Sequence, residues 1–231
     1  MAEAALAVSA ASPAEHPVAL ELTDISKGFP GVQALDRVSL TLRRGEVQAL
    51  LGENGAGKST LIKIITGVYR ADQGSYRING EPVTIANPRQ AFAHGIGVVH
   101  QERSLVPTFT AGENVLLERI VGTAFQVIDR EKIHRDARPF MEMVGLAIDP
   151  SHRVESLSPA QKQLIEIARA LRQNGKVLIL DEPTSALSAR ESERLEAVLR
   201  RLRDEGVALL YISHRLDEVF RLADRLTVLR N

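Results

Sequence analysis

The sequence contains no cysteine. Disulfide bonds, thiolate catalysis and cysteine-bound metal are therefore excluded. Neither sign of charge is in excess, because 29 basic residues balance 29 acidic ones. The chain also lacks a basic stripe interleaved with aromatic residues, so we expect no nucleic-acid partner. No apolar run approaches the roughly 20 residues that a membrane-spanning helix needs, so any link to a membrane requires a partner protein.

The length of 231 residues suits one large domain, or a core domain with an inserted subdomain. Residues 1–17 are rich in Ala, Ser and Pro, and they lack the basic start and long apolar stretch of a signal peptide. We expect them to be a disordered leader before a domain at residues 18–231. The absence of cysteine fits a cytoplasmic location.

Short apolar strands alternate with helical patterns along most of the chain, which is typical of an α/β fold with a parallel sheet. Helical spacing dominates residues 102–173, so we assign this segment to an inserted helical subdomain. An Asn-Gly turn at 79–80 predicts a hairpin. The expected strands are 19–22, 38–42, 46–51, 76–78, 83–85, 96–99, 177–180, 207–212 and 226–229. The expected helices are 61–65, 88–93, 114–120, 130–144, 159–172, 189–203 and 216–223.

The segment that starts at position 52 contains the pattern G-x-x-x-x-G-K-[ST] of a phosphate-binding loop. An apolar strand precedes it and an apolar helix follows, which is the context that a true P-loop requires. Glycines let the backbone N–H groups curl around phosphate oxygens, and the helix N-terminus favours an anion. We predict nucleotide binding, with Lys58 on the outer phosphates and the Ser59 hydroxyl on Mg²⁺. The binding residues are Gly52, Glu53, Asn54, Gly55, Ala56, Gly57, Lys58, Ser59 and Thr60.

The strand expected at 177–180 ends in two adjacent carboxylates, Asp181 and Glu182. In an enzyme with a P-loop, such a strand lies beside the phosphate loop and its terminal acid holds Mg²⁺. The second acid is then placed to orient the attacking water. The structural alternative is a buried strand that leaves the core through a polar turn at Pro183. The P-loop favours the catalytic interpretation.

Two strand ends and one helix start have both a structural and a functional interpretation. His214 and Gln101 each follow an apolar strand, and ligands bind at the carboxyl ends of strands in open α/β sheets. On spacing alone, a lone histidine there is more often structural, and a glutamine is usually a surface residue. Ser158 and Gln161 have the spacing of a capping box with Pro159 at the first helical position. A capped helix start is also an anion site.

In this order, the motifs resemble the ATP-binding-cassette (ABC) ATPase domain over about residues 18–230. The resemblance implies a P-loop NTPase fold with a RecA-like parallel-sheet core, an antiparallel β subdomain and an inserted α-helical subdomain. It also implies ATP and Mg²⁺ as cofactors.

The resemblance implies roles for particular residues. Catalysis falls to Glu182, to the switch histidine His214 and to the Q-loop glutamine Gln101. Phe29 corresponds to the aromatic residue that stacks on adenine in the family. Ser158 and Gln161 correspond to residues of the family's signature motif, which contact nucleotide. The Mg²⁺ ligands are Ser59, Gln101 and Asp181.

Two segments, 25–35 and 212–225, further resemble the ATPases of bacterial simple-sugar importers of the ribose, galactose and xylose type. Those proteins usually contain two fused cassettes, and this chain resembles the first. We therefore expect the chain to stop before a second cassette.

One departure from the family pattern concerns its signature, usually Leu-Ser-Gly-Gly-Gln. Pro159 and Ala160 stand at the glycine positions here. In the family this segment faces the γ-phosphate of ATP held by the opposite cassette. Pro159 has no N–H to donate, whereas Ser158 keeps its hydroxyl. We expect the composite site that uses this signature to be weaker than its counterpart.

The leading hypothesis is an ATP-hydrolysing subunit that powers the import of a simple sugar or related small solute. Its implied partners are a second cassette, membrane permease subunits and a solute-binding protein, which places it at the inner face of the cell membrane. Two alternatives stay open: a soluble ABC ATPase of translation or DNA repair, and a non-catalytic regulatory cassette. The neutral charge and the importer-like segments argue against the first, and the intact catalytic positions argue against the second.

Overall fold

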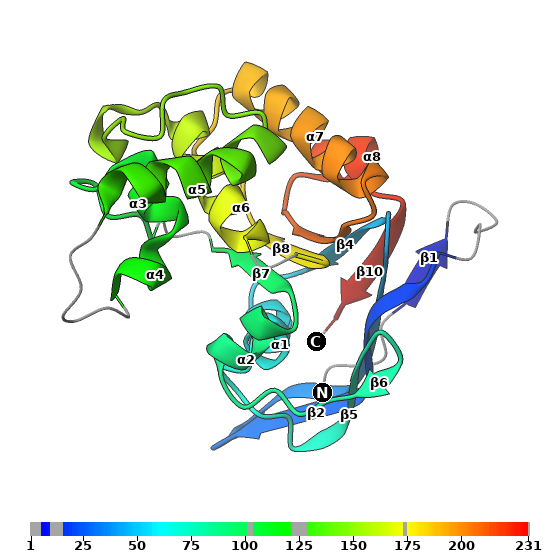
Figure 1. Cartoon of the computed structure of the whole chain (residues 1–231). Helices are drawn as coiled ribbons and strands as arrows, with labels where there is room; N and C mark the ends of the chain where they lie inside the picture. Colours follow the sequence, from blue (N-terminus) through cyan, green and yellow to red (C-terminus); the bar gives the residue numbers. More distant parts are fainter. Residues whose placement is uncertain (1–5, 10–15, 101–103, 122–128, 173–174, 231) are drawn as a thin grey trace.

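The computed structural model describes residues 6–9, 16–100, 104–121, 129–172 and 175–230 (Figure 1). The described residues form two sheets with helices packed around the larger one. Helices α3, α5, α6 and α7 lie on one side of that sheet, and α1 and the smaller sheet lie on the other (Figure 1). The expected α/β fold is therefore confirmed.

The larger sheet runs in the order β1-β10-β4-β9-β8-β7 among the described residues. All its neighbouring strands are parallel except β1 and β10. Within this sheet, the five strands after β1 agree with the predicted ones to within one residue at each end. The strands are β1 (Leu6–Ser9), β4 (Val47–Gly52), β7 (Ile96–Val99), β8 (Val177–Asp181), β9 (Ala208–Ile212) and β10 (Arg225–Leu229).

The smaller sheet is antiparallel and has the order β3-β2-β5-β6. Its strands are β2 (Val18–Phe29), β3 (Val32–Arg43), β5 (Gln73–Ile78) and β6 (Glu81–Pro82). The predicted hairpin at 79–80 is confirmed, because Asn79 and Gly80 both have positive φ and Ile78 pairs with Glu81. The strand expected at 83–85 is wrong: β6 ends at Pro82, and Ile85 is buried in the core outside any strand.

The helices of the sheet region agree with the predicted segments, and those of the helical segment agree in part. The helix expected at 114–120 is divided at Leu116, whose φ of −106° and ψ of 25° end α3. The helices are α1 (Lys58–Ile65), α2 (Pro88–Ala93), α3 (Ala111–Val115), α4 (Leu117–Val121), α5 (Arg130–Met143), the 3₁₀ turn η1 (Val154–Ser156), α6 (Pro159–Leu171), α7 (Ala189–Asp204) and α8 (Leu216–Leu222).

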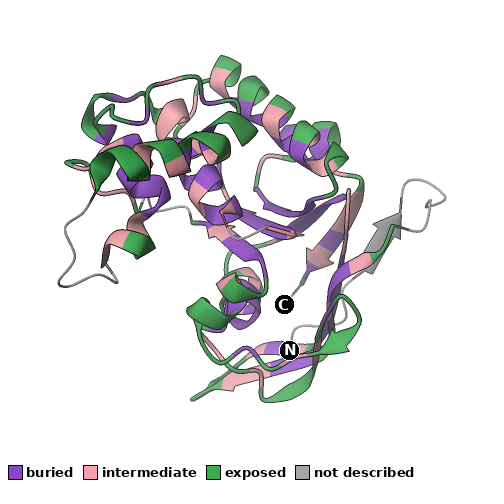
Figure 2. Cartoon of the chain, viewed as in Figure 1, coloured by how far each residue is buried: buried purple, intermediate pink, exposed green. Residues whose placement is uncertain are grey.

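Both faces of the larger sheet are buried, which explains why its strands are continuously apolar rather than alternating. Leu178 and Leu180 of β8 join the core beneath α5, α6 and α7. Val177 and Ile179 face the opposite way and pack with α1 and the smaller sheet. Strands β4, β8 and β9 accordingly lie in the buried centre of the molecule (Figure 2). Because both faces of the sheet are packed, the strands cannot shift easily, and the loops that follow their carboxyl ends have fixed starting positions.

Residues 6–9 differ from the expectation of a leader without structure. They form β1, which pairs antiparallel with β10 in the register Leu6 to Val228. The physical reason is that β10 otherwise presents an open edge, and an open edge offers unpaired N–H and C=O groups to an additional strand. The sequence pattern of a short segment does not reveal such a distant partner.

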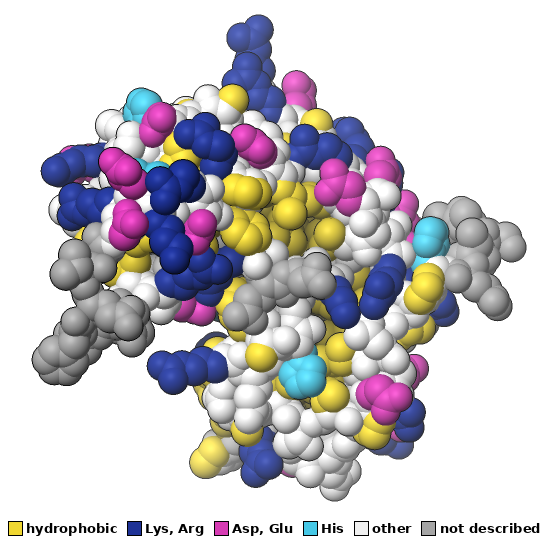
Figure 3. Space-filling view, viewed as in Figure 1, with side chains coloured by type: hydrophobic (Ala, Val, Ile, Leu, Met, Phe, Trp, Pro, Cys, Tyr) yellow, Lys and Arg dark blue, Asp and Glu magenta, His cyan; other side chains and the backbone are white. Residues whose placement is uncertain are grey.

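The helical segment joins the sheet through α6, which packs against β7 as well as against α3 and α5. The exposed face of the helical segment carries cationic side chains interspersed with anionic ones (Figure 3). Within the described residues, no helix has the length and apolar character needed to cross a membrane.

Candidate functional site

The register of three parallel strands brings the predicted site residues to one edge of the sheet. Ile212 of β9 pairs with Leu50 of β4 on one side and with Asp181 of β8 on the other. The loop after Gly52, the carboxylates after Leu180 and the loop after Ile212 therefore begin at the same level. This is the carboxyl edge, where ligands of open α/β sheets bind.

Glycine is required at two positions of the loop at 52–60. Gly52 has φ +155°, and an added Cβ would lie 2.7 Å from the carbonyl oxygen of Leu229. Gly57 has φ +94°, and an added Cβ would lie 2.6 Å from the carbonyl oxygen of Ala34. Gly57 is also the N-cap of α1 and provides no side-chain cap. The first N–H groups of the helix are thus available to an anion.

Lys58 is held against the loop that it follows. Its Nζ donates to the carbonyl oxygens of Gly52 at 2.6 Å and Glu53 at 2.9 Å. The ammonium group therefore lies beside the N-terminus of α1, where it adds positive charge to the helix dipole. Ser59 is exposed at the first turn of the same helix. These positions suit the binding of phosphate oxygens.

Glu182 and His214 lie in direct contact across the edge of the sheet. His214 Nδ1 is 3.1 Å from Glu182 Oε1, and the Glu182 N–H donates to the carbonyl oxygen of Ile212 at 2.9 Å. Glu182 has φ +49°, a conformation that is uncommon outside glycine and is often found at functional sites. The structure thus brings together two residues that are 32 positions apart in the sequence.

The surroundings of Asp181 disfavour the ionisation of its carboxyl group. Its partial burial and, next, the charge of Glu182 raise the pKa of Asp181 above its ordinary value. The charges of His100 and Lys58 act in the opposite direction. A cation beside Asp181 would relieve the unfavourable charge.

The donor set at this edge fits Mg²⁺. Asp181 and Ser59 offer oxygen ligands, which Mg²⁺ prefers. No group of three or more His, Cys, Asp or Glu suited to a metal occurs in the described part of the chain. Mg²⁺ commonly uses one or two protein oxygens and completes its shell with phosphates and water. The residues present therefore suit a metal that arrives with a nucleotide.

Phe29 lies at the end of β2, with its side chain partly exposed. Its ring meets the Tyr69 ring edge-on with centroids 5.3 Å apart, and Lys27 Nζ lies 5.7 Å from its centroid. The Tyr69 N–H donates to the carbonyl oxygen of Lys63 on α1. Phe29 is thus tied to the helix that follows the P-loop. Its assignment to adenine stays a prediction.

The capping box predicted at the start of α6 is confirmed. Ser158 Oγ accepts from the Gln161 N–H at 3.3 Å, and Gln161 Oε1 accepts from the Ser158 N–H at 2.9 Å. Pro159 occupies the first helical position. These bonds establish the structural role, and the contact of Ser158 and Gln161 with nucleotide stays a prediction.

One predicted site residue is not among the described residues, and one residue beside the site was not predicted. Gln101 lies outside the described residues. His100, which precedes it and follows β7, was not predicted, yet its charge acts on Asp181. The rule that ligands bind at strand ends would have identified His100, because Val99 pairs with Leu180 in the register of β7 and β8.

A glycine-rich loop between β4 and α1, with two carboxylates at the end of β8, which β9 separates from β4 in the same parallel sheet, defines the class of P-loop nucleotide-binding folds. Comparison with known proteins narrows the class. The family described as ABC transporter matches residues 35–185. This chain belongs to that family.

Two relatives have names that specify import. The arabinose import ATP-binding protein AraG of Rhizobium meliloti is 51% identical over 212 residues, which are 92% of this chain and 42% of that protein. The ribose import ATP-binding protein RbsA 1 of Burkholderia thailandensis is 49% identical, again over 92% of this chain and 42% of that protein. The chain thus spans about two fifths of the length of these curated relatives.

Solved structures of ATP-binding cassettes have the same fold. The ADP conformation of a cassette from an ABC transporter aligns with a TM-score of 0.81 at 30% identity, covering 91% of this chain and 87% of that one. A dimeric cassette in a post-hydrolysis state, bound to ADP and Pi, aligns with a TM-score of 0.74 at 26% identity, covering 91% and 94%.

Gly57→Ala should weaken both folding and nucleotide binding, because the added Cβ also meets Leu35 Cδ2 at 2.6 Å. Gly55→Ala is the matched control, since Gly55 has φ +90° and an added Cβ there meets nothing within 4 Å. Both variants incur the left-handed cost of about 1–2 kcal/mol. Urea unfolding of the two variants measures their free energies of unfolding, and the difference between them is the cost of the steric clash at position 57. Equal losses in both would contradict this account of Gly57.

Asp181→Asn should raise the melting temperature of the nucleotide-free protein at neutral pH. The raised pKa means that ionised Asp181 destabilises the folded state at high pH, and that this cost disappears as the pH falls below the unfolded value of about 3.9. The advantage of the variant should therefore shrink in acid. In the control Asp149→Asn, stability should fall, because hydrogen bonds from Ser151 lower the pKa of Asp149. Thermal unfolding across pH tests both; an Asp181→Asn variant no more stable than wild type at neutral pH would contradict the account.

Proposed function

We propose that this chain is the ATP-hydrolysing cassette of an importer for a simple sugar or related small solute. The observation that supports it most directly is the contact of Glu182 with His214, at the sheet edge where the P-loop begins. The importer part of the proposal comes from the names of the relatives, which specify arabinose and ribose import. Neither name supports a role in translation or DNA repair.

In this proposal the phosphates of ATP lie on the loop at 52–60. The backbone N–H groups at the start of α1 and the Lys58 ammonium bind the phosphate oxygens. Phe29 stacks on the adenine ring. Ser59, Asp181 and Gln101 hold Mg²⁺, which neutralises charge on the phosphate oxygens when it is bound.

Glu182 and His214 divide the catalytic work. The Glu182 carboxylate accepts a hydrogen bond from the attacking water and orients it toward the γ-phosphate. His214, in contact with that carboxylate through Nδ1, turns its other ring nitrogen toward the γ-phosphate. Gln101 also responds to the γ-phosphate. Catalysis of this kind depends mostly on positioning and on stabilisation of charge.

A second cassette completes the nucleotide site. The dimeric relative bound to ADP and Pi supports this arrangement. Ser158 and Gln161 of this chain then face the ATP that the other cassette holds. Because Pro159 lacks an N–H and Ala160 carries a methyl group, the site that uses this signature is the weaker of the two.

Permease subunits and a solute-binding protein complete the system, with this chain on the inner face of the cell membrane. A groove of about 380 Å³ offers a docking place for the permease. It is lined by α2, β7, α4 and α6, so it spans the sheet and the helical segment. A partner seated there is sensitive to any shift of the helical segment against the sheet.

Lys58→Ala and Glu182→Gln should separate binding from turnover. Lys58→Ala removes the cation that binds the phosphates and should abolish productive ATP binding. Glu182→Gln keeps the shape of the side chain and should preserve binding, while hydrolysis falls on the order of 100-fold or more. Binding of a fluorescent ATP analogue and phosphate release by the reconstituted transporter measure the two steps. Normal hydrolysis by Glu182→Gln would remove the catalytic assignment.

Replacing both Pro159 and Ala160 with glycine should increase ATP turnover at the composite site that uses this signature. The change restores an N–H at position 159 and removes a methyl group at position 160. It also weakens the start of α6, since glycine costs about 1 kcal/mol relative to alanine within a helix. Phosphate release by the full assembly is the measurement. Turnover unchanged from wild type counts against a weakened signature.

A further inference from the structure

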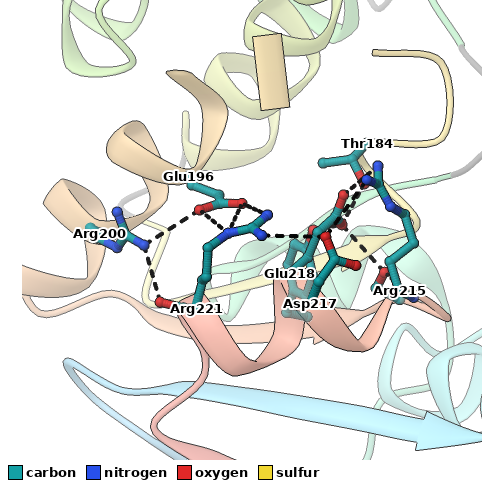
Figure 4. Close-up of polar contacts among 9 residues, drawn as sticks. Thr184, Glu196, Arg200, Arg215, Asp217, Glu218 and Arg221 are labelled. Atoms are coloured by element: carbon teal, nitrogen blue, oxygen red, sulfur yellow. Dashed lines mark hydrogen bonds and ion pairs between the residues drawn. The ribbon is translucent and has the colours of Figure 1, made fainter. Parts of the chain in front are cut away.

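The carboxylate of Glu218 on α8 is fully buried, accepts hydrogen bonds from three residues and forms an ion pair with a fourth (Figure 4). Its Oε2 accepts from Thr184 Oγ1 at 2.7 Å, from the Tyr211 hydroxyl at 2.8 Å and from Ser213 Oγ at 3.4 Å. Its Oε1 lies 2.6 Å from Arg215 Nη1. A single side chain thus joins donors from two segments of the chain, the turn after β8 and residues 211–215.

These donors lie beside the two residues that we assign to catalysis. Thr184 is two residues after Glu182, in the turn that follows β8. Ser213 and Arg215 are the two neighbours of His214 in the sequence. The Glu218 carboxylate therefore connects the loop that carries Glu182 to the loop that carries His214.

Hydrogen bonds between residues close in sequence fix the conformation of each of these loops. In the histidine loop, the Arg215 N–H donates to Ser213 Oγ at 3.0 Å, and the Glu218 N–H donates to the Arg215 carbonyl oxygen at 3.2 Å. In the other loop, the Ser185 N–H donates to the Glu182 carbonyl oxygen at 3.2 Å. A shift of Thr184 or Ser213 is therefore passed on to Glu182 or His214.

The left-handed backbone of Glu182 makes such support necessary. A non-glycine residue at φ +49° persists only where surrounding contacts hold it. Thr184 Oγ1 provides one of those contacts through Glu218. The interaction is strong because a buried carboxylate forms shorter and stronger hydrogen bonds than a neutral acceptor. Burial, and next the bond to Glu218, raise the pKa of Tyr211, so its hydroxyl stays protonated and continues to donate.

A second buried carboxylate on the neighbouring helix provides a comparison. Glu196 of α7 binds Arg221 of α8, with Nη2 to Oε1 at 2.8 Å, and Arg200, with Nη2 to Oε2 at 3.4 Å (Figure 4). These contacts join α7 to α8 and involve neither catalytic loop. Glu196 resembles Glu218 in burial and charge but differs in what it connects.

We propose that Glu218 is a positioning residue that sets the contact between Glu182 and His214. The proposal rests on the proposed function only for the effect on ATP hydrolysis. The effect on the geometry of His214 does not depend on it. Glu218 acts through Thr184, Ser213 and Arg215, whose side chains reach its carboxylate.

Glu218→Gln is the test variant, because the amide keeps the size of the side chain. It removes the negative charge that pairs with Arg215 and replaces one acceptor oxygen with an N–H donor. We expect kcat for ATP hydrolysis by the reconstituted transporter to fall on the order of 100-fold, the scale of a misplaced catalytic group. We expect KM to stay within about twofold, because the P-loop is untouched. Glu196→Gln, the matched control, should leave both constants near wild type. Equal kinetic effects of the two variants would overturn the proposal.

A spectroscopic measurement on the chain alone separates positioning from a general loss of stability. In protein with isotope-labelled histidine, the imidazole resonances of His214 are assigned from their absence in His214→Ala. Glu218→Gln should move these resonances, and Glu196→Gln should not. Unmoved resonances in Glu218→Gln overturn the proposal, whatever the kinetics. If wild type hydrolyses no ATP, the proposed function fails, and the resonances still decide the role of Glu218.

Thr184→Val covers the case in which Glu218→Gln does not fold. This variant removes one donor from the carboxylate and replaces the hydroxyl with a methyl group of similar size. It should move the His214 resonances and lower kcat by a smaller factor, about tenfold. A folded Thr184→Val protein with wild-type resonances and wild-type kcat would contradict the proposed connection.

Discussion

The backbone pairing of β9 with β4 and β8 is the constraint on which the candidate site depends. Ile212 lies in register with Leu50 and Asp181, so the three strands end together. A shift by one residue in either pairing would separate the P-loop from the carboxylates and would turn buried side chains to the wrong face. Because both faces of the sheet are packed, such a shift is strongly disfavoured.

The site places charged groups where the fold alone would not favour them. Asp181 is partly buried beside another carboxylate, Glu182 has a left-handed backbone, and Glu218 is fully buried. Each feature is unfavourable by itself. Each is offset locally: by the positive charge of Lys58, by the hydrogen bonds around the turn after β8, and by the donors to Glu218. Residues that disfavour folding in isolation thus gather at the edge where we propose catalysis.

Local patterns in the sequence predicted most of the fold, because strand ends, a P-loop and an Asn-Gly turn are short-range features. Features that depend on distant partners were not predicted. The pairing of β1 with β10 requires an open edge contributed by the other end of the chain, and the role of Glu218 requires the distant side chain of Thr184 as well as those of residues 211–215. The φ of Glu182 also follows from tertiary packing, since glutamate has no preference for it. The loop, the carboxylates and the histidine lie at the strand ends where the sequence pattern placed them, and their roles stay predictions, whereas Gln101 lies outside the described residues.

We propose that ATP binds at this edge with Glu182 and His214 facing its γ-phosphate. A crystal structure of the chain with Mg²⁺ and a non-hydrolysable ATP analogue would show whether it does. We expect phosphate oxygens on the N–H groups of residues 52–60, and the γ-phosphate beside His214 Nε2 and the Glu182 carboxylate. Phosphates bound elsewhere, or a γ-phosphate remote from both side chains, would contradict it.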